Sequence, residues 1–512
     1  MPETVGLAIL TGLQAAGVPG IAGFALTSTT VAGVGLATIV GSATILGVSI
    51  GLQYALNNPE VPKPENGAIP IKQAIPVRQR GYWINRISGP YMLFLAGGGD
   101  SQDVLALHHG RIEAITQVYM HDTAVAVVPA VSHGTVVTVQ QVGGNQFRDG
   151  AVRCEFYFGL PSQPWAQLLQ TYIPATWTNS FRGHGIAYGV VYCSQIGDPS
   201  EFTKVYPQGV PLLSVVARCS PVWDPRDPAQ DRFDDTTWVA SPNPVLQLID
   251  YLTRTDGGMG EDLDDILPPA ALAQWMEEAD LCDGRYSCAG MYKFDNSPEN
   301  VIAKILASCD GWMAEAGDGS LSLTVGVYRP PLDNPLTAKH ILGWSVKDGI
   351  ADEELINQLD VTYTNPALGY VSDQIDPVRD EDSISAVGYV RSKPLDLSWV
   401  QDPTQANFLG QRGLLRVNPA KTGTLVTDLV GLNYLGKRWI PVQFPEVPGL
   451  EDVIVEIQDR AEVDLLKGRV TFIWSLVDVE ALSALGSLQQ AVLREDGSYL
   501  RREDGTPLQR ES

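Results

Sequence analysis

The chain has 512 residues, with 35 Lys and Arg against 59 Asp and Glu, which gives a formal net charge of −24. Tight nucleic-acid binding needs basic side chains that neutralise phosphates, so this balance argues against it, although DNA could slide past an acidic wall. A chain of this length exceeds one hydrophobic core and predicts three or four domains.

The first predicted element is an arm, residues 1–60. No side chain in residues 4–59 is charged, and the arm is rich in Gly and Ala. A cleaved signal peptide needs a positive start, but the first basic residue is Lys63. Gly47 and Gly51 have the spacing of close helix packing. We expect a hydrophobic, glycine-rich helical arm that is buried in an assembly, conditionally inserted in a membrane, or permanently anchored there.

Residues 61–219 are predicted to form a β-rich domain with an inserted subdomain. Apolar alternation predicts strands, and one interrupting segment predicts a helix. The strands are expected at 135–141, 154–158, 186–192 and 212–217, and the helix near 165–172.

Residues 220–345 change to an α+β pattern. Asn243 and Pro244 are typical of an N-cap and a first-turn proline, and they predict the start of a helix. Asp318-Gly319 predicts a hairpin turn. The other expected elements are helices at 269–282 and 298–309 and hairpin strands at 312–316 and 321–328.

Residues 346–482 are predicted to form another β-rich domain. Strands are expected at 359–364, 452–457 and 469–475, and Asp402-Pro403 predicts a helix start. Residues 483–512 form a tail in which Arg-Glu-Asp-Gly occurs twice, which predicts two exposed turns.

The titratable residues match no catalytic motif. His108, His109 and His121 are the main histidine cluster, and their spacing fits no zinc site. The acidic runs at 224–235 and 261–265 lack the order of an EF-hand. The six cysteines form no C-x-x-C pair, so we expect buried, reduced thiols in a protein made in a cytosol. We predict no catalytic, cofactor or metal site, and no enzyme activity.

Two blocks of the sequence carry a resemblance. In one, Trp-Asp-Pro-Arg226 is followed by Trp238 and then by Asn243-Pro-Val-Leu-Gln-Leu-Ile-Asp-Tyr-Leu-Thr253. The other comprises residues 73–82, 89–94 and 105–113. In order and spacing these blocks resemble the tail tip attachment (J-type, host-specificity) or tail hub proteins of long-tailed phages and gene transfer agents. The resemblance spans residues 60–480.

The resemblance implies a structural virion protein of a siphophage-like tail. Such hubs are homotrimers with tube-like β-barrel domains at the distal end of the tail, closed until the tape measure protein and the DNA leave. The implied partners are the distal tail protein or tail tube, the tape measure protein, and phage DNA in transit without specific binding. Longer relatives carry a receptor-binding tip, whereas this chain stops at Ser512, so we expect a separate receptor-binding or fibre protein.

In such a hub we expect the arm to pack in or near the central channel and, on triggering, to contact the host membrane. The residues expected to make channel or membrane contact are Leu10, Ile21, Phe24, Val40, Ile45, Ile50 and Tyr54. Two other functions stay open from the sequence. They are a membrane-inserting pore component, which would need detergent for extraction, and a tail-associated cell-wall hydrolase, which would clear peptidoglycan in a zymogram.

Overall fold

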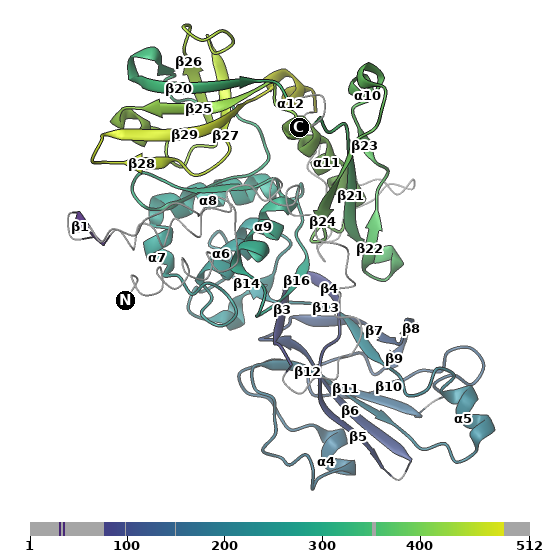
Figure 1. Ribbon diagram of the computed structural model, residues 1–512. Coiled ribbons are helices and arrows are strands. Elements are labelled where there is room, and N and C mark those ends of the chain that lie inside the picture. Colours follow the sequence, from purple (N-terminus) through teal and green to yellow (C-terminus); the bar gives the residue numbers. More distant parts are fainter. Residues whose placement is uncertain are drawn as a thin grey trace.

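The computed structural model describes residues 30–31, 34–35, 76–97, 99–148, 150–350 and 355–485. These residues form a β-rich α+β protein of several packed units (Figure 1). In the expected N-terminal arm the structure describes strands β1 (Thr30–Val31) and β2 (Val34–Gly35), which pair antiparallel. The helical form expected for the rest of the arm, and the Asp-Gly turns expected in the tail, lie outside the described residues.

The first β domain, residues 76–220, contains two antiparallel sheets. The larger sheet has the order β5 (Tyr91–Gly97), β6 (Asp100–His109), β12 (Ile186–Cys193), β11 (Val152–Phe158), β10 (Val136–Val139) and β9 (Val127–Val128). The smaller sheet has the order β4 (Ile84–Ile87), β13 (Leu213–Arg218), β7 (Ala114–Met120) and β8 (Thr123–Val125). The four strands predicted in this domain are therefore confirmed as β10, β11, β12 and β13.

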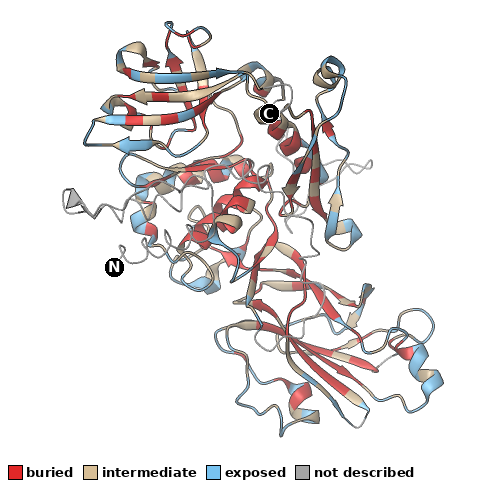
Figure 2. Ribbon diagram, viewed as in Figure 1, coloured by how far each residue is buried: buried red, intermediate tan, exposed pale blue. Residues whose placement is uncertain are grey.

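The two sheets enclose one apolar core, because alternate side chains of each strand point to the same face. Ile87 and Val215 of the smaller sheet share this core with Phe156 and Val191 of the larger one, and all four are buried. Figure 2 shows strands of this domain in red, the colour of buried residues. The chain runs from β4 almost directly into β5 and from β8 into β9, so two corners join the sheets.

Two helices flank this domain at separate places (Figure 1). Helix α4 (Gln167–Tyr172), the predicted one, packs Leu169 against Tyr157 and Tyr188 on the outer face of the larger sheet. Helix α5 (Pro199–Val205) was not predicted; Asp198 caps it by accepting a hydrogen bond from the N–H of Ser200.

The α+β unit, residues 221–328, follows. Its elements are β14 (Pro221–Val222), the 3-10 helix η1 (Asp235–Thr237), β15 (Val239–Ala240), α6 (Pro244–Thr253), α7 (Leu263–Ile266), α8 (Pro269–Cys282), β16 (Gly290–Lys293), α9 (Pro298–Ser308), β17 (Trp312–Glu315) and β18 (Leu321–Thr324). The predicted N-cap is confirmed, since Asn243 Oδ1 accepts a hydrogen bond of 3.0 Å from the N–H of Val245. The predicted hairpin is also confirmed, but its second strand ends early because the N–H of Val325 donates to Glu278 instead.

The second β domain comprises residues 336–348 and 421–476. Its sheet has the order β19 (Leu336–Thr337), β26 (Trp439–Gln443), β27 (Val453–Ile457), β29 (Arg469–Leu476), β25 (Lys421–Thr427) and β20 (Ile341–Asp348), with β28 (Glu462–Asp464) beside β29. The 3-10 helix η2 (Ala338–His340) links β19 to β20, so the two edge strands of the sheet are consecutive in the chain. Val470, Phe472 and Trp474 of β29 point into its core, η4 (Leu429–Tyr434) lies between β25 and β26, and α12 (Val479–Leu485) follows β29.

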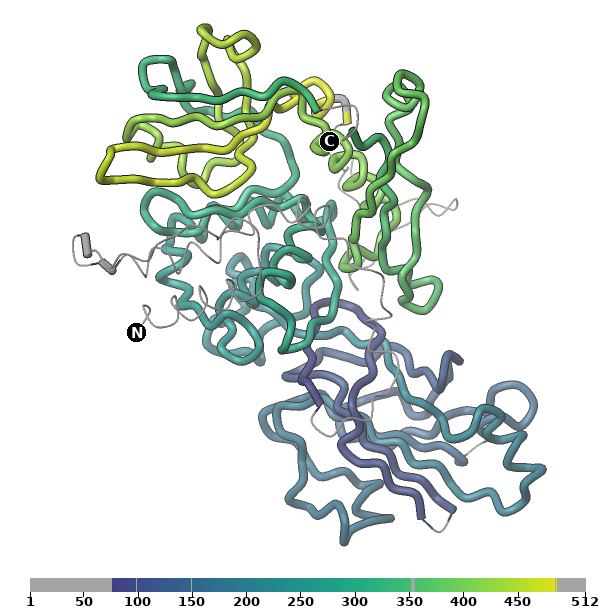
Figure 3. The backbone as a smooth tube through the Cα atoms, in the orientation of Figure 1, coloured from purple at the N-terminus to yellow at the C-terminus, as the bar shows by residue number. Residues whose placement is uncertain are grey.

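An inserted unit, residues 356–417, separates β20 from β25. It contains β21 (Gln358–Asn365), η3 (Pro366–Leu368), β22 (Val371–Gln374), β23 (Val378–Arg379), α10 (Glu381–Val387), β24 (Ser392–Leu397) and α11 (Pro403–Val417). In Figure 3 this green segment leaves the second β domain and lies beside the teal α+β unit. Leu359, Phe408 and Leu409 share one core with α6 and α9.

The amide of Gln405 holds the inserted unit in place. This buried side chain on α11 donates hydrogen bonds to the carbonyls of Ser287 (2.9 Å) and Ser308 (2.6 Å) in the α+β unit. The expected domain boundary between residues 345 and 346 falls inside β20, whose pairing with β25 reaches Asp348.

A buried charge cluster joins three units. Asp310, which follows α9, accepts hydrogen bonds from Arg412 Nε (2.6 Å) and Arg416 Nη2 (2.8 Å) of the inserted unit. Arg438 of the second β domain donates to Asp310 Oδ1 (3.1 Å) and to Glu456 Oε1 (2.8 Å). Asp310 and Arg438 have no exposed side-chain surface.

The charge of Asp310 depends on these guanidinium groups. Burial raises the pKa of Asp310, but Arg416, Arg438 and Arg412 together hold it far below the ordinary 3.8. The stability gained from the charged form is therefore present above pH 3.8 and is lost as the pH falls toward the folded-state pKa. The backbone φ of Asp310 is 51°, a left-handed conformation that is uncommon outside glycine.

We predict that Asp310→Asn destabilises the protein by about 3–5 kcal/mol, because it leaves three buried guanidinium groups with one carboxylate. Thermal unfolding followed by near-UV circular dichroism checks this. The matched control is Asp333→Asn, which breaks a half-exposed pair with Lys437 (3.5 Å) and should change stability by less than about 1 kcal/mol. Equal melting temperatures for Asp310→Asn and wild type would contradict the role of the cluster.

Candidate functional site: the junction between domains

We call the first block of the resemblance, residues 223–226, 238 and 243–253, the signature. Its Asp-Pro-Arg and Asn-Pro parts both contact the C-terminal end of α8. Arg226 donates hydrogen bonds to Asp224 (2.8 Å), Asp280 (2.6 Å) and Asp283 (2.7 Å). Besides capping α6, Asn243 donates from Nδ2 to the carbonyl of Ala279 (2.9 Å) and to Asp283 (2.6 Å). Two segments of the signature, separated in sequence, are thus attached to the same turn.

The aspartate of the signature, Asp250, connects α6 to the first β domain. It is buried and accepts hydrogen bonds from the hydroxyl of Tyr82 (2.8 Å) and from Arg254 Nη2 (2.5 Å), while Arg80 Nη2 lies 3.8 Å away. Burial raises the pKa of Asp250, but Arg254 and Arg80 outweigh burial, so the carboxyl pKa lies below its ordinary value. The group is a structural anion between two cations.

A strand pair continues this junction. Strand β3 (Gln79–Tyr82) of the first β domain pairs antiparallel with β16 of the α+β unit. The ring of Tyr82 lies 6.0 Å from that of Tyr292 and 6.4 Å from that of Trp399, so an aromatic cluster joins the inserted unit as well. At Gly290 a Cβ atom would lie 2.1 Å from the ring of Trp399, which leaves room only for glycine.

A histidine of the predicted cluster stabilises the same junction. His108 is buried; its Nε2 accepts a hydrogen bond from the N–H of Gly81 (3.0 Å) and its Nδ1 donates to the carbonyl of Gly110 (3.2 Å). Burial lowers the pKa of His108 to about 3, so the ring is neutral at physiological pH.

The other two predicted histidines have different surroundings. His109 Nε2 lies 2.7 Å from Asp256 Oδ2, whereas His121 occupies the turn between β7 and β8 with a φ of 54°. Across residues 76–350 and 355–485, apart from the undescribed 98 and 149, no group of three or more His, Cys, Asp or Glu is placed to hold a metal ion. All six cysteines are free and buried, as the sequence predicted.

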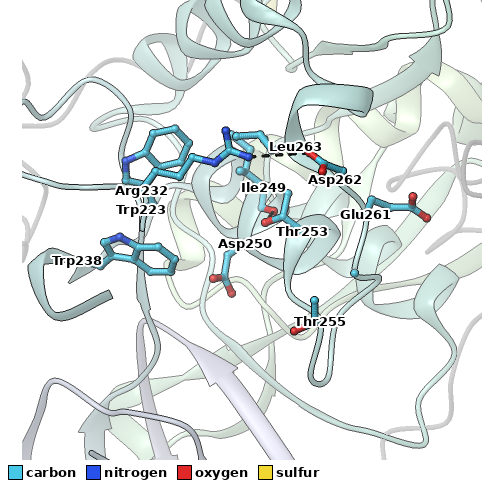
Figure 4. A pocket seen from close by; sticks show the side chains of 11 residues that line it. Trp223, Arg232, Trp238, Ile249, Asp250, Thr253, Thr255, Glu261, Asp262 and Leu263 are labelled. Atoms are coloured by element: carbon cyan, nitrogen blue, oxygen red, sulfur yellow. Dashed lines mark hydrogen bonds and ion pairs between the residues drawn. The ribbon is translucent and has the colours of Figure 1, made fainter. Parts of the chain in front are cut away.

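The signature also lines a pocket of about 370 Å³. Figure 4 shows Trp223 and Trp238 on one side, Glu261 on the other, and Asp250 between them. Arg232 reaches across and pairs with Asp264 (2.8 Å). Burial, and then Asp265, raise the pKa of Glu261. Asp250, which lines the pocket, is the residue that connects α6 to the first β domain, so the pocket borders the junction.

The predicted acidic runs shape loops. Asp231 and Asp234 accept hydrogen bonds from backbone N–H groups two residues later, and Asp262 caps α7 in the same way. These are Asx-type turns, in which a short carboxylate replaces a backbone acceptor.

Sequence reasoning missed Arg80, Tyr82 and Asp310 as junction residues. The local sequence offered no signal for them, since Arg80 lies in the polar run Arg78-Gln-Arg80 and Asp310 is a lone carboxylate between Cys309 and Gly311. The predicted contact residues of the arm, Leu10, Ile21, Phe24, Val40, Ile45, Ile50 and Tyr54, lie outside the described residues. In the part of the chain that the structure describes, no helix is both long and apolar enough to cross a bilayer.

Acidification should weaken the junction through His108. Between pH 6.5 and about 3 the unfolded chain binds a proton that the folded chain excludes, so stability falls as the pH falls. The loss approaches about 1.4 kcal/mol for each pH unit below 6.5. Thermal unfolding at pH 7 and pH 5 should show a smaller decrease for His108→Gln than for wild type; equal decreases would contradict this prediction.

Gly290→Ala should destabilise the junction by about 1–3 kcal/mol, because the new methyl group overlaps the ring of Trp399. The matched control is Gly97→Ala in β5, where an added Cβ meets no atom within 4 Å and stability should change by only about 0.5 kcal/mol. Chemical denaturation checks both variants. A denaturation midpoint for Gly290→Ala equal to that of wild type would contradict this prediction, because it would mean that the ring of Trp399 can move aside without loss of stability.

Comparison with known proteins identifies a solved structure with a similar fold but does not assign the chain to a family. No protein-family model and no curated protein matches the chain. Among solved structures, a chain from the virion of a native gene transfer agent particle is 12% identical, with 84% of this chain and 93% of that chain covered and a TM-score of 0.53.

Two bacterial tail proteins also align, at TM-scores too low to support an argument. They are the 43 kDa tail protein of prophage MuSo2 from Shewanella oneidensis (12% identity, coverage 80% and 100%, TM-score 0.26) and a tail protein from Neisseria meningitidis MC58 (11% identity, coverage 78% and 96%, TM-score 0.27). What the comparisons establish is a fold shared with a chain of the gene transfer agent virion.

Proposed function

We propose that this chain is a structural protein of a phage or gene transfer agent tail, and that it forms the homotrimeric hub of the tail tip. The observation that carries the proposal is the fold shared with a chain of the gene transfer agent virion over 84% of this chain. The sequence blocks that resemble tail hub proteins support the same conclusion independently of the fold.

The arrangement of the signature residues supports a structural role. Arg226 and Asn243 form hydrogen bonds that fix the end of α8 within the α+β unit, and Asp250 accepts one that attaches this unit to the first β domain. An enzyme would instead present such groups to a substrate in a cleft, with hydrogen-bonding capacity left over. These residues therefore fix the packing of the α+β unit and, through Asp250, its attachment to the first β domain.

In the proposed hub the two β domains serve as tube-like barrels. Two such domains in each of three copies would match a sixfold tube or distal tail protein above them. The channel they surround would be closed before infection and would open for the tape measure protein and the DNA. A net charge of −24 favours passage of DNA without specific binding.

The remaining parts of the proposal concern location and partners. The hub would lie at the distal end of the tail after assembly in the host cytoplasm, next to a separate receptor-binding or fibre protein. The charge-free arm, residues 4–59, would pack near the channel and reach the host membrane after triggering.

Immunogold labelling of intact particles tests this proposal. An antibody against residues 329–335 suits the purpose, because Leu332 in that loop is fully exposed. We expect label at the tail end farthest from the head, with an antibody against the capsid labelling heads as the control. Label along the tube or on the head, or particles that lack the chain, would overturn the proposed location.

A further inference from the structure

The first β domain carries a surface with unusually little charge. In residues 156–197 the only Lys, Arg, Asp or Glu is Arg182, although such residues make up 18% of the chain. Much of this segment is exposed, on both sides of α4. We call Trp165, Trp177, Phe181 and Arg182 the aromatic face.

The four side chains of the aromatic face form two contacting pairs, joined in the chain by the neighbouring residues Phe181 and Arg182. The rings of Trp177 and Phe181 lie 5.5 Å apart, and Nε1 of Trp177 donates a hydrogen bond of 3.0 Å to the carbonyl of Phe181. The guanidinium carbon of Arg182 lies 6.0 Å from the ring centre of Trp165. Phe181 is 53% exposed and Trp165 is 45% exposed. Exposed aromatic residues with an arginine and few other charges are typical of the energetic centre of a protein interface.

Charge indicates which partner this face fits. Every copy of the chain has a net charge of −24, so two copies repel each other through their acidic surfaces. A basic partner would be attracted to those acidic surfaces, whereas a second copy can approach closely only where acidic groups are missing. The aromatic face meets that condition, and its single charge is positive.

A complementary surface lies at the other end of the same domain. Val128, Phe202, Val210 and Leu212 are exposed apolar residues around β9 and α5, and we call them the apolar edge. Figure 1 places α5, which carries Phe202, far from α4 across the sheet. Carboxylates accompany the apolar edge: Asp198 caps α5, and Asp122, which pairs with Arg86 at 3.0 Å, has 97% of its side chain exposed.

Two unlike surfaces on opposite ends of one subunit are what a closed ring requires, because each head-to-tail contact uses one surface of each kind. Arg182 on one copy would meet the carboxylates beside the apolar edge of the next. We propose that the aromatic face of one copy packs against the apolar edge of a second copy. This inference rests on the proposed trimer and names the surfaces that form it.

Sedimentation of the full-length chain in a mild non-ionic detergent tests the contact. Trp165→Ser with Phe181→Ser should weaken self-association at least about 30-fold, because both residues are placed as interface hot spots. The control, Leu332→Ser, removes an even more exposed apolar side chain elsewhere and should associate like wild type. Near-UV circular dichroism confirms that each variant is folded.

Photo-cross-linking identifies the partner surface. The full-length chain with p-benzoylphenylalanine at position 181 is mixed with isotopically heavy wild-type chain, irradiated and digested. We expect cross-links to heavy peptides from residues 121–128 or 198–212. Cross-links to the arm, to another segment, or only within the light chain would overturn the inference.

The two measurements separate this inference from the proposed function. If the wild-type chain is a trimer and the Trp165→Ser, Phe181→Ser variant is also a trimer, the trimeric hub stands and these contact surfaces are wrong. A wild-type chain that stays monomeric would count against the trimer and against these surfaces together.

Discussion

The architecture depends on one buried carboxylate. Asp310 follows α9 in the α+β unit, yet its guanidinium partners come from the inserted unit and from the second β domain. None of these charged groups could be buried alone without a large desolvation cost. The α+β unit supplies the carboxylate and the other two units supply the guanidinium groups that neutralise it. The units are consequently held at fixed positions, and Asp310 keeps its left-handed backbone because its carboxylate is bound on several sides.

The same logic governs the junction with the first β domain. Asp250 lies between Arg80 and Arg254, Tyr82 donates to it, and β3 pairs with β16 beside it. Four units thus form a connected body through two buried carboxylates. In the proposed hub, opening of the channel is then expected from movement between copies or of the arm, since movement within a copy would expose unpaired charges.

Local features of the fold were predictable because local chemistry decides them. Helices α6 and α9 begin where a capping side chain is followed by proline, at Asn243-Pro244 and Ser297-Pro298. The hairpin of β17 and β18 turns at Asp318-Gly319. The inserted unit was not predictable, because β20 and β25 are mostly half-buried or exposed and nothing local shows that they pair across it. The partners of Asp310 and Asp250 were missed for a related reason: isolated arginines in sequence do not indicate which carboxylate they meet in space.

The insertion between β20 and β25 also has a consequence for biosynthesis. Strand β20 leaves the ribosome long before β25 and β29, the strands against which its sheet is built. During that interval Trp344 and Val346 have no sheet to join, while the inserted unit can already pack on the α+β unit. Contacts between segments distant in sequence close slowly and leave strand edges open to wrong pairing. The edge of β20 therefore stays unpaired in the nascent chain until β25 has been synthesised.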